Sequence, residues 1–285
     1  EIVNPNHLGT AGTANDRLTA NGGGVNILSA QLLGASTFLS GAFPASYGNS
    51  LSGIMDMQLR KGNNEQYEFT GQVGLIGIDL AAEGPFSKKS DASFLINYRY
   101  STLGILSALG VDLGDEAITF QDLSFNLNLP TKKAGKFTLF GIGGQSSNVF
   151  AGPRDTSLLV EDKDQFDIEF ASRVGILGAT HVMPLGKSTW RTSVAYSTLA
   201  STRIADQLDT SFQQMIFARD TLQEQKLSAT TNFSRRLSDK LRWQIGATAT
   251  LLAMDVFSQS PGSALLDGTG GGWLLRPYTN LRVQV

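Results

Sequence analysis

Few residues of this chain have the types and spacing that catalysis or metal binding requires. Its two histidines, His7 and His181, stand alone, and the chain has no cysteine. Disulfides and thiolate metal sites are therefore excluded, and no G-x-S-x-G nucleophile motif is present. His181 lies in a strand-like pattern, where we expect a lumen or packing residue rather than a ligand. We predict no catalytic residue, no metal site, no cofactor and no enzyme activity.

Three other features could bind ions, and each has a simpler interpretation. The glycine triplets at 22–24 and 270–272 lack the Lys-Ser/Thr or strand-to-helix setting of a phosphate loop, so we interpret them as flexible turns. The acidic stretches at 112–116 and 160–164 lack the regular spacing of a calcium loop and are expected to be solvated. Arg154 could meet an anionic ligand, but a lone loop arginine is usually solvated.

The composition limits the class of protein. Only 17% of the 285 residues are charged, below the roughly 25% of soluble proteins, and the formal net charge of −2 gives no case for a nucleic-acid partner. No apolar run approaches the roughly 20 residues of a membrane helix, whereas a membrane β-strand needs only about 9–11. The chain starts at Glu1 without a secretory leader, so we expect a processed protein or an internal fragment of a longer one.

From Gln66 onward, alternation with a period of two dominates and predicts strands. Phe94, Ile96 and Tyr98 share one face, for example, and Asn97 and Arg99 the other. We split the stretch at 66–85 near Leu75–Gly77, where glycines permit a tight reversal. The resulting ten strands cover approximately 66–74, 78–84, 91–102, 117–129, 136–146, 166–184, 189–201, 223–236, 240–256 and 271–285. Pro277 predicts a bulge or an unpaired edge position in the last strand.

Short and long connections alternate between these strands. The short polar turns lie at 84–90, 130–136, 184–189 and 236–240, and the long irregular segments at 103–117, 147–165, 202–222 and 257–270. In an up-and-down sheet, the short turns then share one end and the long loops the other, as in outer-membrane barrels. Two further features favour a membrane barrel. Aromatic residues lie near strand ends, namely Trp190, Tyr98, Tyr100, Trp243 and Trp273. Charged residues lie on the polar face, namely Arg99, Asp122, Arg191 and Arg242.

Residues 1–62 differ from this pattern. They begin as turn-rich backbone, followed by a short helix or buried turn in "ILSAQLLG", a short strand at 35–39 and another at 53–59. Between these two strands lies "GAFPASYGNSLSG", a compact loop that contains Gly41, Phe43, Pro44, Tyr47 and Gly48 and ends at Gly53. We expect Gly41 and Gly48 to adopt backbone conformations that other residues avoid, and Phe43 and Tyr47 to pack the loop against its surroundings.

This loop and the strand after it resemble the end of the plug domain of TonB-dependent outer-membrane receptors, especially the type common in Bacteroidota. The pattern is Gly-x-Phe-Pro-x-x-Tyr-Gly, then Ser52-Gly53 and a strand ending in Arg60 and Lys61. Residues 4–9, 71–86 and 135–144 also resemble this family. The resemblance implies an all-β fold: a transmembrane antiparallel up-and-down β-barrel, here partial with about ten strands, preceded by part of a lumen plug. Residues 1–62 would be the C-terminal part of the plug, and 63–285 the first part of the barrel.

The resemblance also implies a function. The whole protein would take up a scarce nutrient (siderophore, vitamin, oligosaccharide or peptide), and TonB would bind through an N-terminal motif missing from this chain. Outer-membrane lipid would surround the barrel, and a surface lipoprotein is a further partner that the family allows. The residues Gly41, Phe43, Pro44, Tyr47, Gly48 and Gly53 would act in structure or gating. We expect ligand contacts in the four long loops and in plug loops around 19–25 and 41–50, without assigning individual residues.

Two alternatives stay open at the level of the sequence. A passive or adhesive outer-membrane barrel predicts that residues 1–62 form no lumen plug. A soluble all-β carbohydrate-binding protein predicts a polar outer surface, and an outward apolar belt about 25 Å tall would exclude it.

Overall fold

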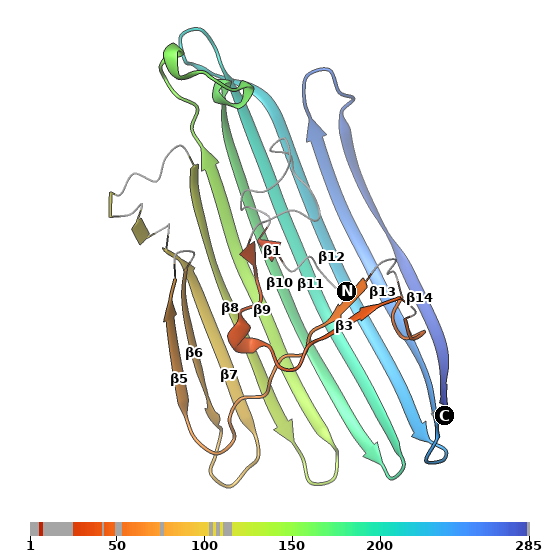
Figure 1. Ribbon diagram of the computed structural model, residues 1–285. Coiled ribbons are helices and arrows are strands. Elements are labelled where there is room, and N and C mark those ends of the chain that lie inside the picture. Colours follow the sequence, from red (N-terminus) through yellow and green to blue (C-terminus); the bar gives the residue numbers. More distant parts are fainter. Residues whose placement is uncertain are drawn as a thin grey trace.

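Ten strands form a single antiparallel sheet in which each strand pairs with its neighbours in sequence (Figure 1). The computed structural model describes residues 6–7, 25–41, 43–48, 53–74, 77–102, 105–106, 109–110 and 116–283. The strands of the sheet are β5 (Glu68–Val73), β6 (Gly77–Pro85), β7 (Ser93–Ser101), β8 (Glu116–Pro130), β9 (Lys136–Phe150), β10 (Phe166–Leu185), β11 (Ser188–Leu208), β12 (Gln214–Arg236), β13 (Leu241–Gln259) and β14 (Leu266–Val283). The ten predicted strands and the reversal between β5 and β6 are confirmed.

The prediction was wrong at the long-loop end of the sheet. The expected loops at 202–222 and 257–270 are mostly strand, and only 209–213 and 260–265 connect β11 to β12 and β13 to β14. Of the other two expected long loops, 147–165 is strand up to Phe150 and then carries the short 3-10 helices η3 (Thr156–Leu158) and η4 (Asp162–Gln165), and 103–117 lies largely outside the described residues. Pro277 lies on the edge strand β14 opposite Ala247, without a register shift between the two strands.

The two faces of the sheet are reversed relative to those of a soluble protein. On one face, polar side chains are buried: Asn97 and Ser124 are 0% exposed and Asp122 is 2% exposed. On the other face, Leu123 is 50% and Leu177 54% exposed. We call these the inner and the outer face. Because burying polar groups and exposing apolar ones in water is unfavourable, the outer face is suited to apolar surroundings.

The apolar part of the outer face is a belt with polar borders. On β13 it runs from Trp243 to Leu251, about 27 Å along the strand at 3.4 Å per residue and about 20 Å in height at a tilt near 40°. Toward the long-loop end, the belt ends at a row of polar side chains that runs across neighbouring strands on the outer face. This row contains Gln121, Gln145, Arg173, Gln223 and Asp255.

Aromatic side chains lie at both borders of the belt and hydrogen-bond to neighbouring strands. At the short-turn border, the indole N–H groups of Trp190 and Trp243 donate to the hydroxyls of Thr231 (2.8 Å) and Thr279 (3.0 Å). At the opposite border, the hydroxyl of Tyr98 donates to Gln121 (3.0 Å). Such side chains, apolar in body and polar at the tip, are typical of a boundary between an apolar layer and water.

The N-terminal segment, residues 25–63, lies across the inner face (Figure 1). It contains the strand β2 (Val25–Asn26), which pairs with β1 (Asn6–His7), the 3-10 helix η2 (Ala30–Leu32), and the hairpin of β3 (Thr37–Ser40) and β4 (Gly53–Asp56). These elements agree with the short turn and the two strands expected here, although β4 ends earlier than predicted. No helix in the described part of the chain is long and apolar enough to span a membrane.

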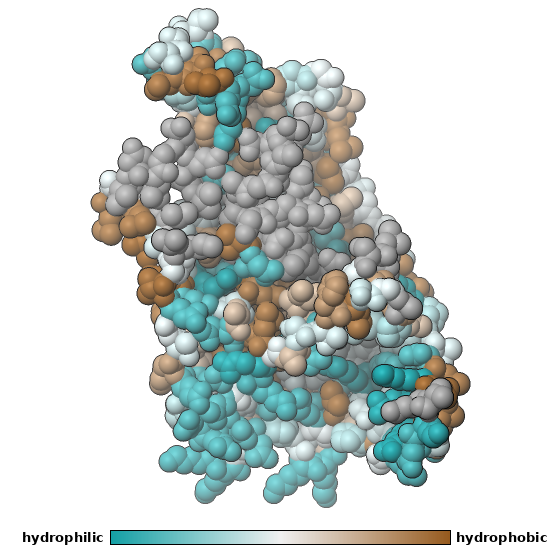
Figure 2. All heavy atoms as spheres, viewed as in Figure 1, coloured by the Kyte–Doolittle hydropathy of each residue, from teal (hydrophilic) through white to brown (hydrophobic). Residues whose placement is uncertain are grey.

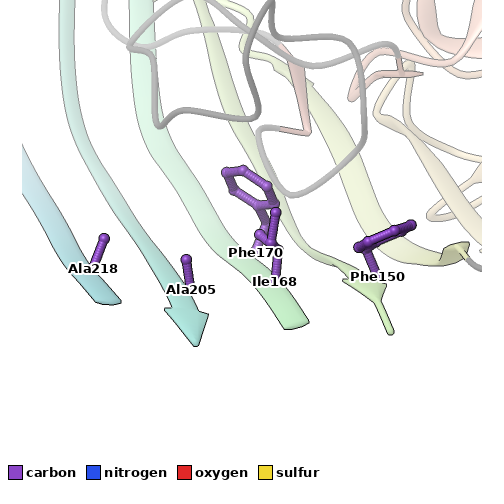
Figure 3. Packing of buried hydrophobic residues seen from close by; sticks show 5 residues of the cluster. All are labelled: Phe150, Ile168, Phe170, Ala205 and Ala218. Atoms are coloured by element: carbon purple, nitrogen blue, oxygen red, sulfur yellow. The ribbon is translucent and has the colours of Figure 1, made fainter. Parts of the chain in front are cut away.

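Beyond the belt, the inner face carries an apolar cluster at the long-loop end. The side chains of Phe150, Ile168, Phe170, Ala205 and Ala218 come from four adjacent strands and lie on the same face (Figure 3). The period of two is less regular here, because both faces carry polar residues: the Arg203–Asp220 ion pair lies inside with the cluster, and Glu169 faces outward beside Ile204. This mixing explains why these strand ends resemble loops in the sequence.

Candidate functional site

The predicted plug-motif residues surround the tip of the β3–β4 hairpin. Gly41 follows β3 with a φ of +89°, a conformation that favours glycine. The Tyr47 N–H donates to the Pro44 carbonyl (2.9 Å), which closes a turn, and the Tyr47 hydroxyl donates to Asp56 on β4 (2.8 Å). Burial raises the pKa of Tyr47, and its hydrogen bond to the Asp56 carboxylate raises it further. The hairpin tip is thus fastened to its own second strand.

Gly48 serves a different purpose from the one predicted. It is not among the residues with a positive φ; instead, a Cβ at this position would lie 2.8 Å from a terminal guanidinium nitrogen of Arg276 on β14. Gly53 pairs with Ser40, and a Cβ there would lie 3.0 Å from the Phe38 ring. These glycines permit close approach, to the sheet in one case and within the hairpin in the other. Phe43 is half-buried, and Pro44 is exposed.

The strongest contact between the segment and the sheet is an ion pair that follows the motif. Arg60 donates to both carboxylate oxygens of Glu83 on β6, at 2.9 and 2.6 Å, and the backbone N–H of Asn63 donates to the same carboxylate at 2.7 Å. The Glu83 side chain is 5% exposed and that of Arg60 33%. Arg60 also donates through Nε to the Gln31 carbonyl (2.6 Å), and Asn126 on β8 donates to the Arg60 carbonyl (2.8 Å). We call this group the Arg60–Glu83 anchor.

A second group of polar contacts holds the start of the segment. Arg99 on β7, whose side chain is 15% exposed, forms an ion pair with the buried Asp122 on β8 (2.7 Å) and donates to the carbonyl of Asn26 (2.6 Å). The Ser29 hydroxyl donates to Asp79 on β6 (2.5 Å) and also caps η2 by accepting from the Gln31 N–H. The inner-face carboxylates therefore bind the segment directly or orient an arginine that does.

The segment also buries two apolar side chains, Ile27 and Leu32. Ile27, 1% exposed, packs against Ile142, Val174 and Leu199 on β9, β10 and β11. Because hydrogen bonds to the segment can be exchanged for hydrogen bonds to water, such an interface can open at lower cost than an apolar core.

The sequence motif includes the segment side of this interface but not the sheet side. Arg60 was noted as part of the motif, but Glu83, Asp79 and Asn126 were not recognised. The available signal was the glutamate in "DLAAEGP", which together with Asp79 is ionisable in a strand whose other residues are apolar or small. Its partner depends on how a distant segment packs, which a strand pattern does not specify.

The candidate ion-binding residues of the loops have structural partners. Arg154 is not solvated alone, as predicted, but forms a two-point ion pair with Asp167 (3.0 and 2.6 Å), which raises the pKa of the Arg154 guanidinium. Asp164 accepts from the backbone N–H groups of Val160 and Glu161 at the start of η4, and these bonds lower its pKa. His181 stacks on Phe137 at 4.3 Å. Among the described residues, no group of three His, Cys, Asp or Glu is placed to hold a metal ion.

Comparisons with known proteins support the fold. No family model matches the sequence, and no curated protein does. Among solved structures, the ferric preacinetobactin receptor BauA from Acinetobacter baumannii matches with a TM-score of 0.55 at 12% identity, over 81% of this chain and 38% of BauA. The copper transporter OprC matches with a TM-score of 0.58 at 10% identity, over 99% of this chain and 53% of OprC.

These likenesses confirm the predicted barrel fold: the sheet is an antiparallel up-and-down barrel wall. The chain spans 38% of one of these structures and 53% of the other. At this level of identity, the likeness is one of fold, and the ligands named for the two proteins are theirs.

Proposed function

We propose that this chain is part of a TonB-dependent outer-membrane transporter of the Bacteroidota type, with residues 1–62 as the C-terminal part of the plug and 63–285 as the first part of the barrel. The observation that carries the proposal is the reversed sheet, whose apolar belt faces outward and whose polar inner face is covered by the N-terminal segment. A soluble carbohydrate-binding sandwich would need the opposite arrangement. The motif resemblance of residues 41–61 and the fold shared with a receptor and a transporter support the same conclusion.

The interface between segment and sheet suggests how such a protein would be gated. The anchors consist mainly of hydrogen bonds and ion pairs, so a pulling force on the segment could release them one after another. Water can then hydrate both sides, which limits the free-energy cost of opening. The proposed partner for this work is TonB, acting through a motif outside this chain, and the cargo is a small scarce nutrient.

A reversible lock tests this proposal, because the chain contains no native cysteine. The Ser29 hydroxyl and the Asp79 carboxylate lie 2.5 Å apart, so a Ser29→Cys/Asp79→Cys pair, oxidised or joined by a short dithiol-reactive linker, would tether the segment to β6. The assay is growth of cells that depend on the full-length protein, with limiting iron, copper, cobalamin, peptide or oligosaccharide as the supply.

We expect oxidation to stop growth on the transported nutrient and reductant to restore it, while each single-cysteine variant is indifferent to oxidation. A passive or adhesive barrel predicts that growth on every nutrient is unaffected by the tether. That result, with the tether shown to be complete, would refute the gating role of the segment.

A further inference from the structure

We propose that the short-turn end of β12–β14 holds a pocket that binds a compact phosphate-class oxyanion. A cavity of about 410 Å³ lies at the β12–β13 turn, and its lining includes Arg236, Lys240, Arg242, Arg282 and Asp239. Figure 2 shows that hydrophilic surface gathers at this end of the molecule. Neither the transport proposal nor the plug motif assigns a role to this cluster.

The strand register brings three of the arginines together. Arg236 is the cross-strand partner of Arg242, and Arg242 is the partner of Arg282. Side chains of such partners start from Cβ atoms about 5 Å apart, and like charges placed this way destabilise a sheet. An anion bound between them would offset this repulsion.

The lining residues of the pocket leave most of this charge without compensation. They include four cationic side chains and one acidic side chain, a net charge of +3. Asp239 pairs with Arg236 at 2.7 Å, but the two side chains are 94% and 57% exposed, so solvent screens the pair. By contrast, Arg60, Arg99 and Arg203 elsewhere on the inner side of the sheet each pair with a carboxylate.

The chemistry of the pocket selects a phosphate-class ligand. Guanidinium groups bind phosphate oxygens through two parallel N–H donors, and a row of three offers this geometry to one multiply charged anion. Lys240 adds a mobile ammonium from the turn. The row lies on the inner face, opposite the Trp243–Leu281 pair at the border of the outer apolar belt, so we assign the phosphate to a soluble compound.

The test is a titration of the full-length protein with inorganic pyrophosphate, in zwitterionic nanodiscs and at constant ionic strength. We expect saturable binding by calorimetry. Arg242→Gln should weaken it about ten- to hundredfold, the loss expected for charge-assisted hydrogen bonds, and Arg242→Lys should recover part of it. The matched control is Arg191→Gln, an exposed cation on the inner face of β11 that does not line the pocket.

A second arm tests this assignment. Nanodiscs that contain phosphatidylglycerol should leave the affinity for pyrophosphate unchanged, and weaker binding in them would identify a lipid headgroup as the ligand instead. The proposal is overturned if no saturable binding occurs in zwitterionic nanodiscs, or if Arg191→Gln weakens it as much as Arg242→Gln. Either result leaves the transport proposal untouched, since the segment and its anchors are not involved.

Discussion

Removal of the charge of Glu83 should release the N-terminal segment from the sheet. In Glu83→Gln, the side chain keeps its size and one acceptor oxygen, but Arg60 loses its two-point ionic contact and the Asn63 N–H loses a charged acceptor. Breaking a buried pair costs about 3–5 kcal/mol. Because the Arg60 side chain is 33% exposed and can rehydrate, we expect a smaller loss than this, about 2–3 kcal/mol in the free energy of opening the segment.

Hydrogen exchange measures this opening directly. The amides of Gly34 and Arg60 donate to carbonyls within the segment, to Gln58 (2.7 Å) and Leu32 (2.8 Å), so they should exchange when the segment opens. A loss of about 2–3 kcal/mol corresponds to exchange about 30- to 160-fold faster. Amides of the β12–β13 ladder should keep their rates, because the sheet does not depend on the anchor.

The matched control is Glu169→Gln, which changes an exposed glutamate on β10 whose cross-strand partners are Val149 and Ile204, away from the anchor. It should leave the exchange of the Gly34 and Arg60 amides unchanged. Wild-type rates in Glu83→Gln, or equal acceleration in both variants, would refute the anchor role of this ion pair.

Two further predictions concern the segment. A Cβ in Gly62→Ala would collide with the Phe94 carbonyl oxygen, whereas at Gly74 the nearest atom is 3.7 Å away. We expect the first change to cost about 1–3 kcal/mol and Gly74→Ala much less, measured by denaturant unfolding in detergent. Because the pKa of Tyr47 is raised in the folded protein above its usual 10.0, its contribution to hairpin stability is complete below pH 10 and is lost as the pH rises through the folded value. Tyr47→Phe should remove this alkaline dependence, and its persistence in the variant would contradict the assignment.

The sequence predicted the sheet well because most of it follows one physical rule. Where strands alternate between apolar surroundings and a polar interior, the period of two is plain, as along β13 from Trp243 to Leu251. Beyond the belt, both faces contain polar residues, and ion pairs such as Arg203–Asp220 and Arg219–Asp206 join neighbouring strands. Charges of this kind in sequence resemble a loop, which is why 202–222 was wrongly predicted to be irregular.

The site was harder to predict than the fold. The motif glycines mark the loop at 41–48 in the sequence. However, glycine is needed at position 48 because Arg276, more than two hundred residues along the chain, lies close to its backbone. Likewise, the Arg60–Glu83 anchor depends on how the segment crosses the sheet. Register, by contrast, is set within each hairpin by its turn, so the row of Arg236 and Arg242 could have been found by placing the turn at 237–240.

The central claim is that the outer face of this sheet meets lipid and the inner face does not. Single cysteines at positions 247 to 252 of β13, in a full-length protein from which any cysteine outside this chain has been removed, can carry a fluorophore in bilayers that contain brominated lipid. We predict strong quenching at 247, 249 and 251 and weak quenching at 248, 250 and 252. Quenching with the opposite phase, or none at any of the six positions, would contradict the account.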